Sequence, residues 1–358
     1  MLAGSISPAS CRGDRRDDAL SFETGTVAPR GSFVYLVGRS GKEAPGRGLF
    51  LDVASGRRVP VPSAPDLRSL AFAADGSHVA WLEKESRLVT RDLSAPDGAA
   101  HELHLEATNP SALASSPNGD RVAVLDATRL LVADAATGRT LLSAPLPDRI
   151  PRALVFVAPG RVRLYPTQRY EAAKEEAPRT DTILELDLAT GALRETGKVV
   201  AAANFPGLTL RPSASGERLL SLERRRTLIT LRDGATGEAI AALPTGAPER
   251  VDLFGSSPPG KLRAAAFLAG GRIAAILHAE QGSVLRVYSP DGGLAFSSPL
   301  EEKAGLAAIL GEAAPGILVV AVGSKENVRD VHVLAVDLST GKIRNRASAL
   351  SPLDPMAF

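Results

Sequence analysis

The sequence is poor in the residues that build metal and redox sites. It has a single cysteine, five histidines and one tryptophan among 358 residues. One cysteine excludes an intramolecular disulfide and a cysteine-based metal cage. An excess of one charge is also missing, because 42 Lys and Arg against 40 Asp and Glu leave a formal net charge of +2. A chain this close to neutrality has no overall field that would attract nucleic acid, and we expect no nucleic-acid partner.

Long hydrophobic runs and catalytic motifs are absent as well. No stretch approaches the ~18 apolar residues of a transmembrane helix. The sequence contains no HExxH metal motif, no glycine-rich phosphate loop and no GxSxG nucleophile elbow. His101 and His104 are three residues apart in a predicted strand, so they point to opposite faces and cannot hold one ion. We therefore predict no catalytic residues, no metal and no cofactor.

Residues 1–19 are predicted to form a disordered N-terminal tether, and two interpretations of Cys11 remain open. Small Ala9 and Ser10 before it favour a lipidated cysteine of an envelope lipoprotein whose start codon lies upstream. Pro8 fits such a cleavage box poorly, and the other interpretation is an incidental cysteine in a disordered terminus. A lipid anchor at Cys11 predicts an extracytoplasmic location, periplasmic or anchored to the envelope; without it the prediction is cytoplasmic.

A short turn motif recurs along the chain. Five segments read Asp-x-Ala/Ser-Thr/Ser-Gly, and two degenerate copies fill the gaps between them. Each copy separates two apolar runs of alternating pattern, and successive copies are about 40 to 55 residues apart. The turn glycines are Gly56, Gly98, Gly138, Gly191, Gly237, Gly292 and Gly341. The spacing predicts seven structural repeats.

Each repeat is predicted to hold four antiparallel strands. A second series of turns, such as Asp75-Gly76 and Asn118-Gly119, divides the repeats again, and Asn-Gly and Asp-Gly are strong hairpin signals. In the third repeat the strands are predicted at residues 111–115, 121–125, 130–134 and 140–144. One thin meander cannot bury both faces, so seven copies must cover one another around an axis. The sequence thus predicts an all-β, seven-bladed β-propeller of four-stranded antiparallel blades over residues 20–350, with 351–358 as a C-terminal tail.

Two of the hairpin segments carry a family resemblance. Ser116-Pro-Asn-Gly-Asp-Arg-Val-Ala-Val124 and Ala73-Ala-Asp-Gly-Ser-His-Val-Ala-Trp81 resemble the SPDGKxIAF unit of bacterial TolB-type propeller repeats. The Asp-x-Ala-Thr-Gly turns are similar to those of YVTN-type and quinoprotein-like blades. The Trp-Asp dipeptide and buried His of WD-repeats are missing, which disfavours that branch of WD-repeat-like proteins. These resemblances imply a fold and not a particular function.

The longer insertions are predicted on one face of the ring. They occupy residues 39–47, 167–182, 223–227 and 324–330, and loops on a rigid scaffold commonly carry binding function. The candidate partner-binding residues are Arg39, Lys42, Arg169, Tyr170, Arg224, Arg225, Arg226, Lys325 and Arg329. We expect a non-catalytic scaffold for protein–protein interaction that binds a protein or peptide through this face. The alternatives are a lactonase- or cyclase-like enzyme with a site at the axial channel mouth, and a structural envelope lipoprotein.

Overall fold

In a computed structural model of the 358-residue chain, the described residues are almost entirely β-strand. The structure describes residues 21–27, 33–39, 47–52, 57–61, 70–73, 76–83, 87–95, 100–105, 107, 110–126, 128–147, 152–166, 179–201, 208–223, 228–246, 262–279, 282–300, 304–324 and 331–348. The one helical turn within these ranges is a 3-10 turn at Ala269–Gly271.

The strands group into four-stranded antiparallel sheets, seven of them within the described ranges, and each sheet contains four consecutive strands. Sheet 1 contains β1 (Ser21–Val27), β2 (Phe33–Arg39), β3 (Arg47–Asp52) and β4 (Arg58–Val61). Sheet 2 contains β5 (Leu70–Phe72), β6 (His78–Glu83), β7 (Arg87–Asp92) and β8 (His101–His104). Sheet 3 contains β9 (Pro110–Ser115), β10 (Arg121–Asp126), β11 (Arg129–Asp134) and β12 (Thr140–Pro145).

The remaining sheets repeat this order. Sheet 4 contains β13 (Arg152–Ala158), β14 (Arg161–Pro166), β15 (Arg179–Asp187) and β16 (Leu193–Ala201). Sheet 5 contains β17 (Leu208–Pro212), β18 (Arg218–Glu223), β19 (Leu228–Asp233) and β20 (Ala239–Leu243). Sheet 6 contains β21 (Leu262–Phe267), β22 (Ile273–Ala279), β23 (Gly282–Tyr288) and β24 (Leu294–Pro299). Sheet 7 contains β25 (Ala304–Ala314), β26 (Ile317–Ser324), β27 (Val331–Asp337) and β28 (Ile343–Ser348).

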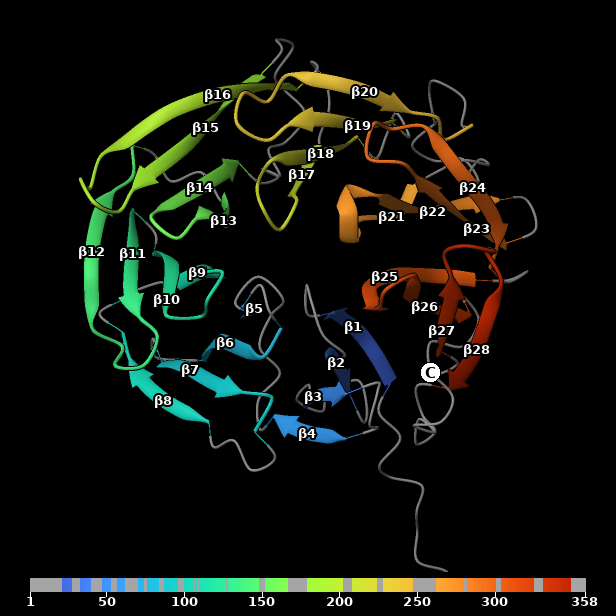
Figure 1. The fold of residues 1–358 in the computed structure, drawn as a ribbon, viewed down its shortest axis with the longest axis horizontal. Helices are drawn as coiled ribbons and strands as arrows, with labels where there is room; N and C mark the ends of the chain where they lie inside the picture. The colour runs from blue at the N-terminus through green and yellow to red at the C-terminus, as the bar shows by residue number, and fades with distance from the viewer. Residues whose placement is uncertain are drawn as a thin grey trace, which may run out of the picture.

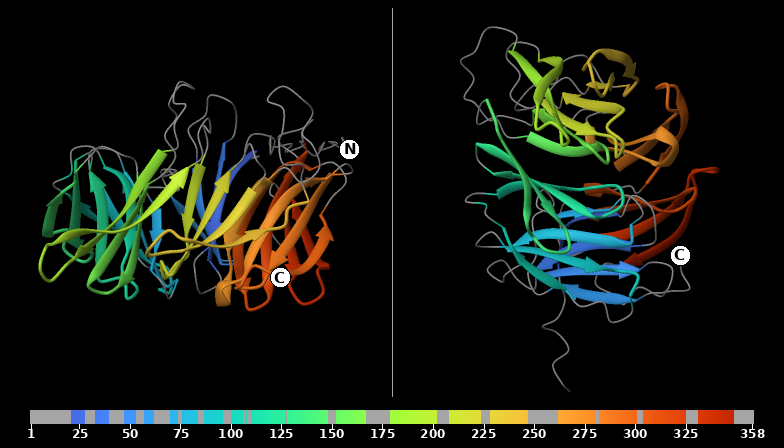
Figure 2. Two further views of the ribbon diagram at one scale, coloured as in Figure 1. Left: turned by 90° about the horizontal axis from the view of Figure 1, so that it is seen from above. Right: turned by 60° about the vertical axis from the view of Figure 1, so that its left-hand side comes forward.

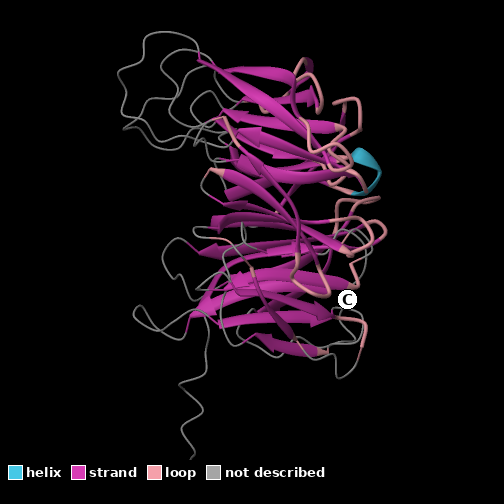
Figure 3. Cartoon of the chain, turned by 90° about the vertical axis from the view of Figure 1, so that its left-hand side faces the viewer, coloured by secondary structure: helices cyan, strands magenta, loops and turns pink. Residues whose placement is uncertain are grey.

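The sheets stand around a common axis with the first strand of each nearest the centre (Figure 1). Strand β1 lies beside β25, so the first and last sheets meet and complete the ring. Seen from the side, the strands run between two edges of a thick disc (Figure 2). We call one of these the turn edge, because the described turns gather there (Figure 3). These turns join the first strand to the second and the third to the fourth in each sheet.

The predicted strands of the third repeat agree with β9 to β12 to within one residue. The predicted insertion at 167–182 was too long, because β15 begins at Arg179. Residues 179–182 pair with the far end of β16, from Lys198 to Ala201. This part of sheet 4 alternates apolar and polar residues only weakly, which is why the sequence did not reveal the extension of the hairpin.

The aspartates of the recurrent turns accept hydrogen bonds from their own turn backbone, as the sequence predicts. The Asp134 Oδ1 atom accepts the backbone N–H of Ala136 at 3.1 Å and that of Thr137 at 2.8 Å. Asp187, Asp233 and Asp337 make equivalent bonds in their own turns. This geometry is that of an Asx turn, which stabilises a tight reversal of the chain.

The glycine at the end of this turn also packs against the preceding sheet. Gly237 has a φ of +78°, and a Cβ there would lie 2.5 Å from the carbonyl oxygen of Lys198 in sheet 4. The backbone N–H of Lys198 donates to the Thr236 carbonyl at 3.0 Å, which fastens the two sheets together. Gly138 approaches Leu103 of sheet 2 in the same way. The motif therefore closes one sheet and docks it on its neighbour.

Apolar side chains fill the spaces between adjacent sheets. Val132 of sheet 3, for example, packs with Leu154 and Val162 of sheet 4. Mutual burial of this kind is what thin sheets require, since none can cover both of its own faces. In the described part of the chain, no helix has the length and apolar character needed to pass through a membrane.

Candidate functional site

The partner-binding residues predicted from sequence lie almost wholly outside the described ranges. Arg39 is the last residue of β2, at the edge opposite the turn edge. Its side chain is not among those described. The other predicted residues and the lipidation candidate fall outside the described ranges: Cys11, Lys42, Arg169, Tyr170, Arg224, Arg225, Arg226, Lys325 and Arg329. The predicted loop-face site therefore stays a prediction.

A different polar site appears at the junction of sheets 4 and 5. Equivalent positions in the seven sheets can be compared by counting back from the recurrent turn after the third strand. In each sheet, the third-strand residue two positions before the first residue of that turn pairs with a residue of the second strand, and both face the next sheet. These pairs are Tyr35/Phe50, Ala80/Thr90, Ala123/Val132, Arg163/Glu185, Leu220/Leu231, Ala274/Val287 and Val319/Ala335. Of these seven pairs, only that of sheet 4 is charged.

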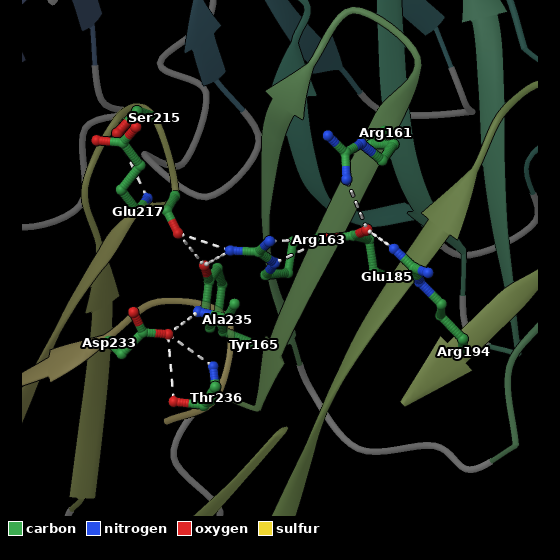
Figure 4. A network of polar contacts seen from close by, with 11 residues as sticks. Arg161, Arg163, Tyr165, Glu185, Arg194, Ser215, Glu217, Asp233, Ala235 and Thr236 are labelled. Atoms are coloured by element: carbon green, nitrogen blue, oxygen red, sulfur yellow. Dashed lines mark hydrogen bonds and ion pairs between the residues drawn. The ribbon is translucent and has the colours of Figure 1, made fainter. Parts of the chain in front are cut away.

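The Glu185 side chain is 2% exposed and is held by three arginines (Figure 4). Arg163 of β14 donates to Glu185 Oε2 from Nε at 3.1 Å and from Nη2 at 2.7 Å. Arg194 of β16 donates from Nη2 to Oε1 at 2.8 Å. Arg161 Nη1 lies 3.5 Å from the same Oε1 atom. We call Arg161, Arg163, Glu185 and Arg194 the Glu185 cluster.

The cluster also connects sheet 4 to sheet 5. The Nη1 atom of Arg163, whose side chain is only 10% exposed, donates to the carbonyl oxygen of Gly216 at 2.7 Å. The hydroxyl of Tyr165 donates to the same oxygen at 3.0 Å. Gly216 has a φ of +68° in the turn between β17 and β18, and a Cβ there would overlap Val157 Cγ1. The turn of sheet 5 thus rests directly on the polar face of sheet 4.

The electrostatics of the cluster keep its groups charged. Burial raises the pKa of Glu185, but hydrogen bonds from Arg194 and Arg163 outweigh burial and hold that pKa below its ordinary value. Burial lowers the pKa of Arg163, and its contacts with Tyr165 and Glu185 more than compensate, so the pKa is raised. Burial raises the pKa of Tyr165. An ionised Glu185 whose oxygens are filled by arginine donors is a poor general base, and the arrangement suits recognition of a charged group better than proton transfer.

Sequence reasoning missed this site although a signal was present. In the run Arg161-Val-Arg-Leu-Tyr165, Arg163 stands at a position that no other sheet fills with a charged residue, as Ala123 and Leu220 illustrate. Glu185 likewise interrupts the apolar run before the turn at Asp187. The register that pairs Arg163 with Glu185 follows from aligning the turns of the repeats, so aligning the repeats residue by residue would have revealed the pair.

In the described part of the chain, no group of three or more His, Cys, Asp or Glu side chains is arranged to hold a metal ion. The positions of His101 and His104 agree with the strand expected from the sequence. His101 and His104 are the first and last residues of β8, and both are exposed on this outermost strand.

The ring of four-stranded antiparallel sheets defines a β-propeller. The structure is similar to the β-propeller domain of Cps50 (Swd1) from Myceliophteria thermophila, with a TM-score of 0.54 and 16% identity over 86% of this chain and 95% of that one. It is also similar to the C-terminal WD40 domain of Sif2, with a TM-score of 0.51 and 14% identity over 90% of this chain and 82% of that one. No protein-family model matches the chain, and no curated protein matches it in sequence.

At these identities the likeness concerns the fold alone, and the fold is a WD40-like β-propeller. The expectation of an all-β propeller made of four-stranded antiparallel units is confirmed. The missing Trp-Asp dipeptide disfavoured the WD-repeat branch, yet the backbone is similar to WD40 domains because strand pairing and mutual burial do not depend on that dipeptide. The resemblance to TolB-type and YVTN-type repeats stays a prediction.

Proposed function

We propose that the chain is a seven-bladed, non-catalytic propeller scaffold that binds a protein or peptide partner. The WD40-like fold supports this proposal, with the seven sheets that the described residues form as the blades. Such a ring is a rigid frame whose loops can vary without disturbing the core. The observation that carries the proposal is that the longest connection within a sheet, residues 167–178, lies at the edge opposite the turn edge.

At the turn edge, β13 and β14 are joined by residues 159–160, and β25 and β26 by residues 315–316. At the opposite edge, β14 and β15 are joined by residues 167–178 and β2 and β3 by residues 40–46. Tight turns serve the fold, whereas long connections add surface without adding to the sheets. The opposite edge is therefore the proposed partner-binding face, with Arg224, Arg225 and Arg226 as its most basic segment.

Affinity capture from extract of the cells that make the protein tests this proposal. The double substitution Arg224→Glu/Arg225→Glu is compared with Arg139→Glu/Lys342→Glu, which changes the charge equally at exposed positions of the turn edge. We expect the wild type and the turn-edge variant to capture the same protein and the loop variant to lose it. Equal capture by both variants, or capture of nothing by the wild type, would contradict the proposal.

A further inference from the structure

The Glu185 cluster contains more positive charge than its own carboxylate neutralises. Three arginines surround one glutamate, and Asp187, whose charge lies near Arg194, adds one further negative charge. The Oδ1 atom of Asp187 accepts the backbone N–H groups of Ala189 and Thr190. A net positive charge therefore remains on two guanidinium groups at the surface.

These two guanidinium groups have donors to spare. The side chains of Arg161 and Arg194 are 48% and 62% exposed, while the Glu185 carboxylate that they share is buried. Among the described residues, Glu185 is the one ion-pair partner of each, through a single guanidinium nitrogen. A guanidinium has five N–H donors in a fixed planar fork, so most donors of both arginines face solvent.

The geometry is set before any ligand arrives. Arg161 lies on β14 and Arg194 on β16, on either side of β15, and both side chains converge on one oxygen of Glu185 (Figure 4). Arg163 occupies the other oxygen of Glu185 and is itself fastened to Gly216 of the next sheet. Side chains that are already ordered lose less conformational entropy when they bind a ligand.

Stability does not explain why the cluster exists. The equivalent pairs of the other sheets are uncharged, and replacing a buried ion pair by apolar residues is commonly neutral or stabilising. Departures from a local rule of the fold are expected at functional sites. The buried pair is thus an exception within an otherwise regular repeat. Arg121 and Arg218 stand opposite their turn aspartates as Arg161 does, but only Arg161 has a glutamate on the neighbouring strand to share with a second surface arginine.

We propose that Arg161 and Arg194 bind a carboxylate side chain of an acidic peptide segment in a protein partner. Arginine forks match carboxylates in charge and in planar geometry. Asp187 lies near Arg194 and the whole chain is nearly neutral, so a single carboxylate fits this surface better than the continuous charge of a nucleic acid. The inference rests on the proposed scaffold function but uses the turn edge, away from the loop face.

Fluorescence anisotropy with fluorescein-labelled hexaglutamate tests the site on the purified full chain. Arg161→Ala/Arg194→Ala is compared with Arg121→Ala/Arg139→Ala, in which Arg121 stands opposite Asp134 in sheet 3 as Arg161 stands opposite Asp187. We expect the first pair to weaken peptide binding at least about tenfold, and the second to change it less than about twofold. Higher salt is expected to weaken binding to the wild type.

A conservative variant separates recognition from loss of folding. Arg161→Lys/Arg194→Lys keeps both charges but removes the planar forks, so we expect an intermediate loss of about threefold with an unchanged circular dichroism spectrum. Equal binding by the cluster variant and its control, or no binding by the wild type, overturns the site. Displacement of the peptide by a lower concentration of single-stranded oligonucleotide overturns the choice of ligand. None of these results changes partner capture by the loop variants, so the two proposals fail separately.

Discussion

The junction between sheets 3 and 4 and the junction between sheets 4 and 5 have the same backbone design and opposite chemistry. In the first, Ala123 and Val132 pack into an apolar core with side chains of sheet 4. In the second, the equivalent residues are Arg163 and Glu185, which pair with each other and reach the turn of sheet 5. The recurrent turns fix the strand register of both junctions. They do not fix what fills the space between the sheets.

Each junction of the ring has to exclude water, and a junction that buries polar groups also has to supply their hydrogen-bond partners. Each junction must exclude water from the faces of two thin sheets, and apolar pairs do so at the least cost. The charged junction meets the same requirement only because each guanidinium nitrogen of the buried pair finds an acceptor. Arg163 donates to both Glu185 and the Gly216 carbonyl oxygen, and the Tyr165 hydroxyl donates a second hydrogen bond to the same Gly216 oxygen.

The largest expected effect comes from breaking the charged pair on one side. Glu185→Leu leaves the buried guanidinium of Arg163 without its counter-charge and should lower the free energy of unfolding by about 3–5 kcal/mol. Urea denaturation followed by circular dichroism measures the change. The control is Glu195→Leu on the outer strand, where an exposed pair with Lys198 is removed and less than about 1 kcal/mol should be lost. Equal losses from the two substitutions would show that Glu185 is not part of a buried pair.

A smaller effect is expected from crowding the turn that rests on the cluster. Gly216→Ala forces an L residue to a φ of +68° and places a methyl group against Val157 and Tyr165, so we expect a loss of about 2–4 kcal/mol. Gly270 has a φ of +70°, and a methyl group added there would meet nothing within 4 Å, so Gly270→Ala should lose only about 1 kcal/mol. Thermal and urea unfolding distinguish the two, and identical losses would mean that the turn of sheet 5 does not touch sheet 4.

The turn of sheet 7 gives a pH-dependent effect. Hydrogen bonds from the hydroxyl and backbone of Ser339, together with Arg344, hold the pKa of Asp337 well below its ordinary value. Ionised Asp337 therefore stabilises the fold above its unfolded pKa of about 3.9, and this contribution is lost as the pH falls through the lower, folded-state pKa. The difference in unfolding free energy between wild type and Asp337→Asn should be largest near neutral pH and shrink in acid. A difference that does not vary with pH would contradict the lowered pKa.

Most of the architecture follows from local sequence signals. The Asp-x-Ala-Thr-Gly turns and the Asn118-Gly119 hairpin predict where the chain reverses. The alternation of apolar and polar residues between them predicts where the strands lie. These signals place β9 to β12 to within one residue. Ring formation follows because a thin sheet must be covered on both faces.

The candidate site was not predicted, because its residues do not form a motif along the chain. Its residues belong to three strands, and only the pairing of β14 with β15 and of β15 with β16 brings Arg161 and Arg194 to one carboxylate. No short motif encodes a cross-strand contact. Reading along the chain finds runs of charge such as Arg224–Arg226, whereas the Glu185 cluster is visible only across the sheet.

The most direct measurement is the stability of the double variant Arg163→Leu/Glu185→Leu, which rebuilds the charged pair as the Leu220/Leu231 pair of sheet 5. Tyr165 still donates to the Gly216 oxygen, so no buried acceptor is left without a partner. The account predicts a free energy of unfolding equal to that of the wild type within about 1 kcal/mol, or higher. A loss as large as that of Glu185→Leu alone would show that the ion pair holds the ring together, and the claim that the charged junction serves binding instead of stability would be wrong.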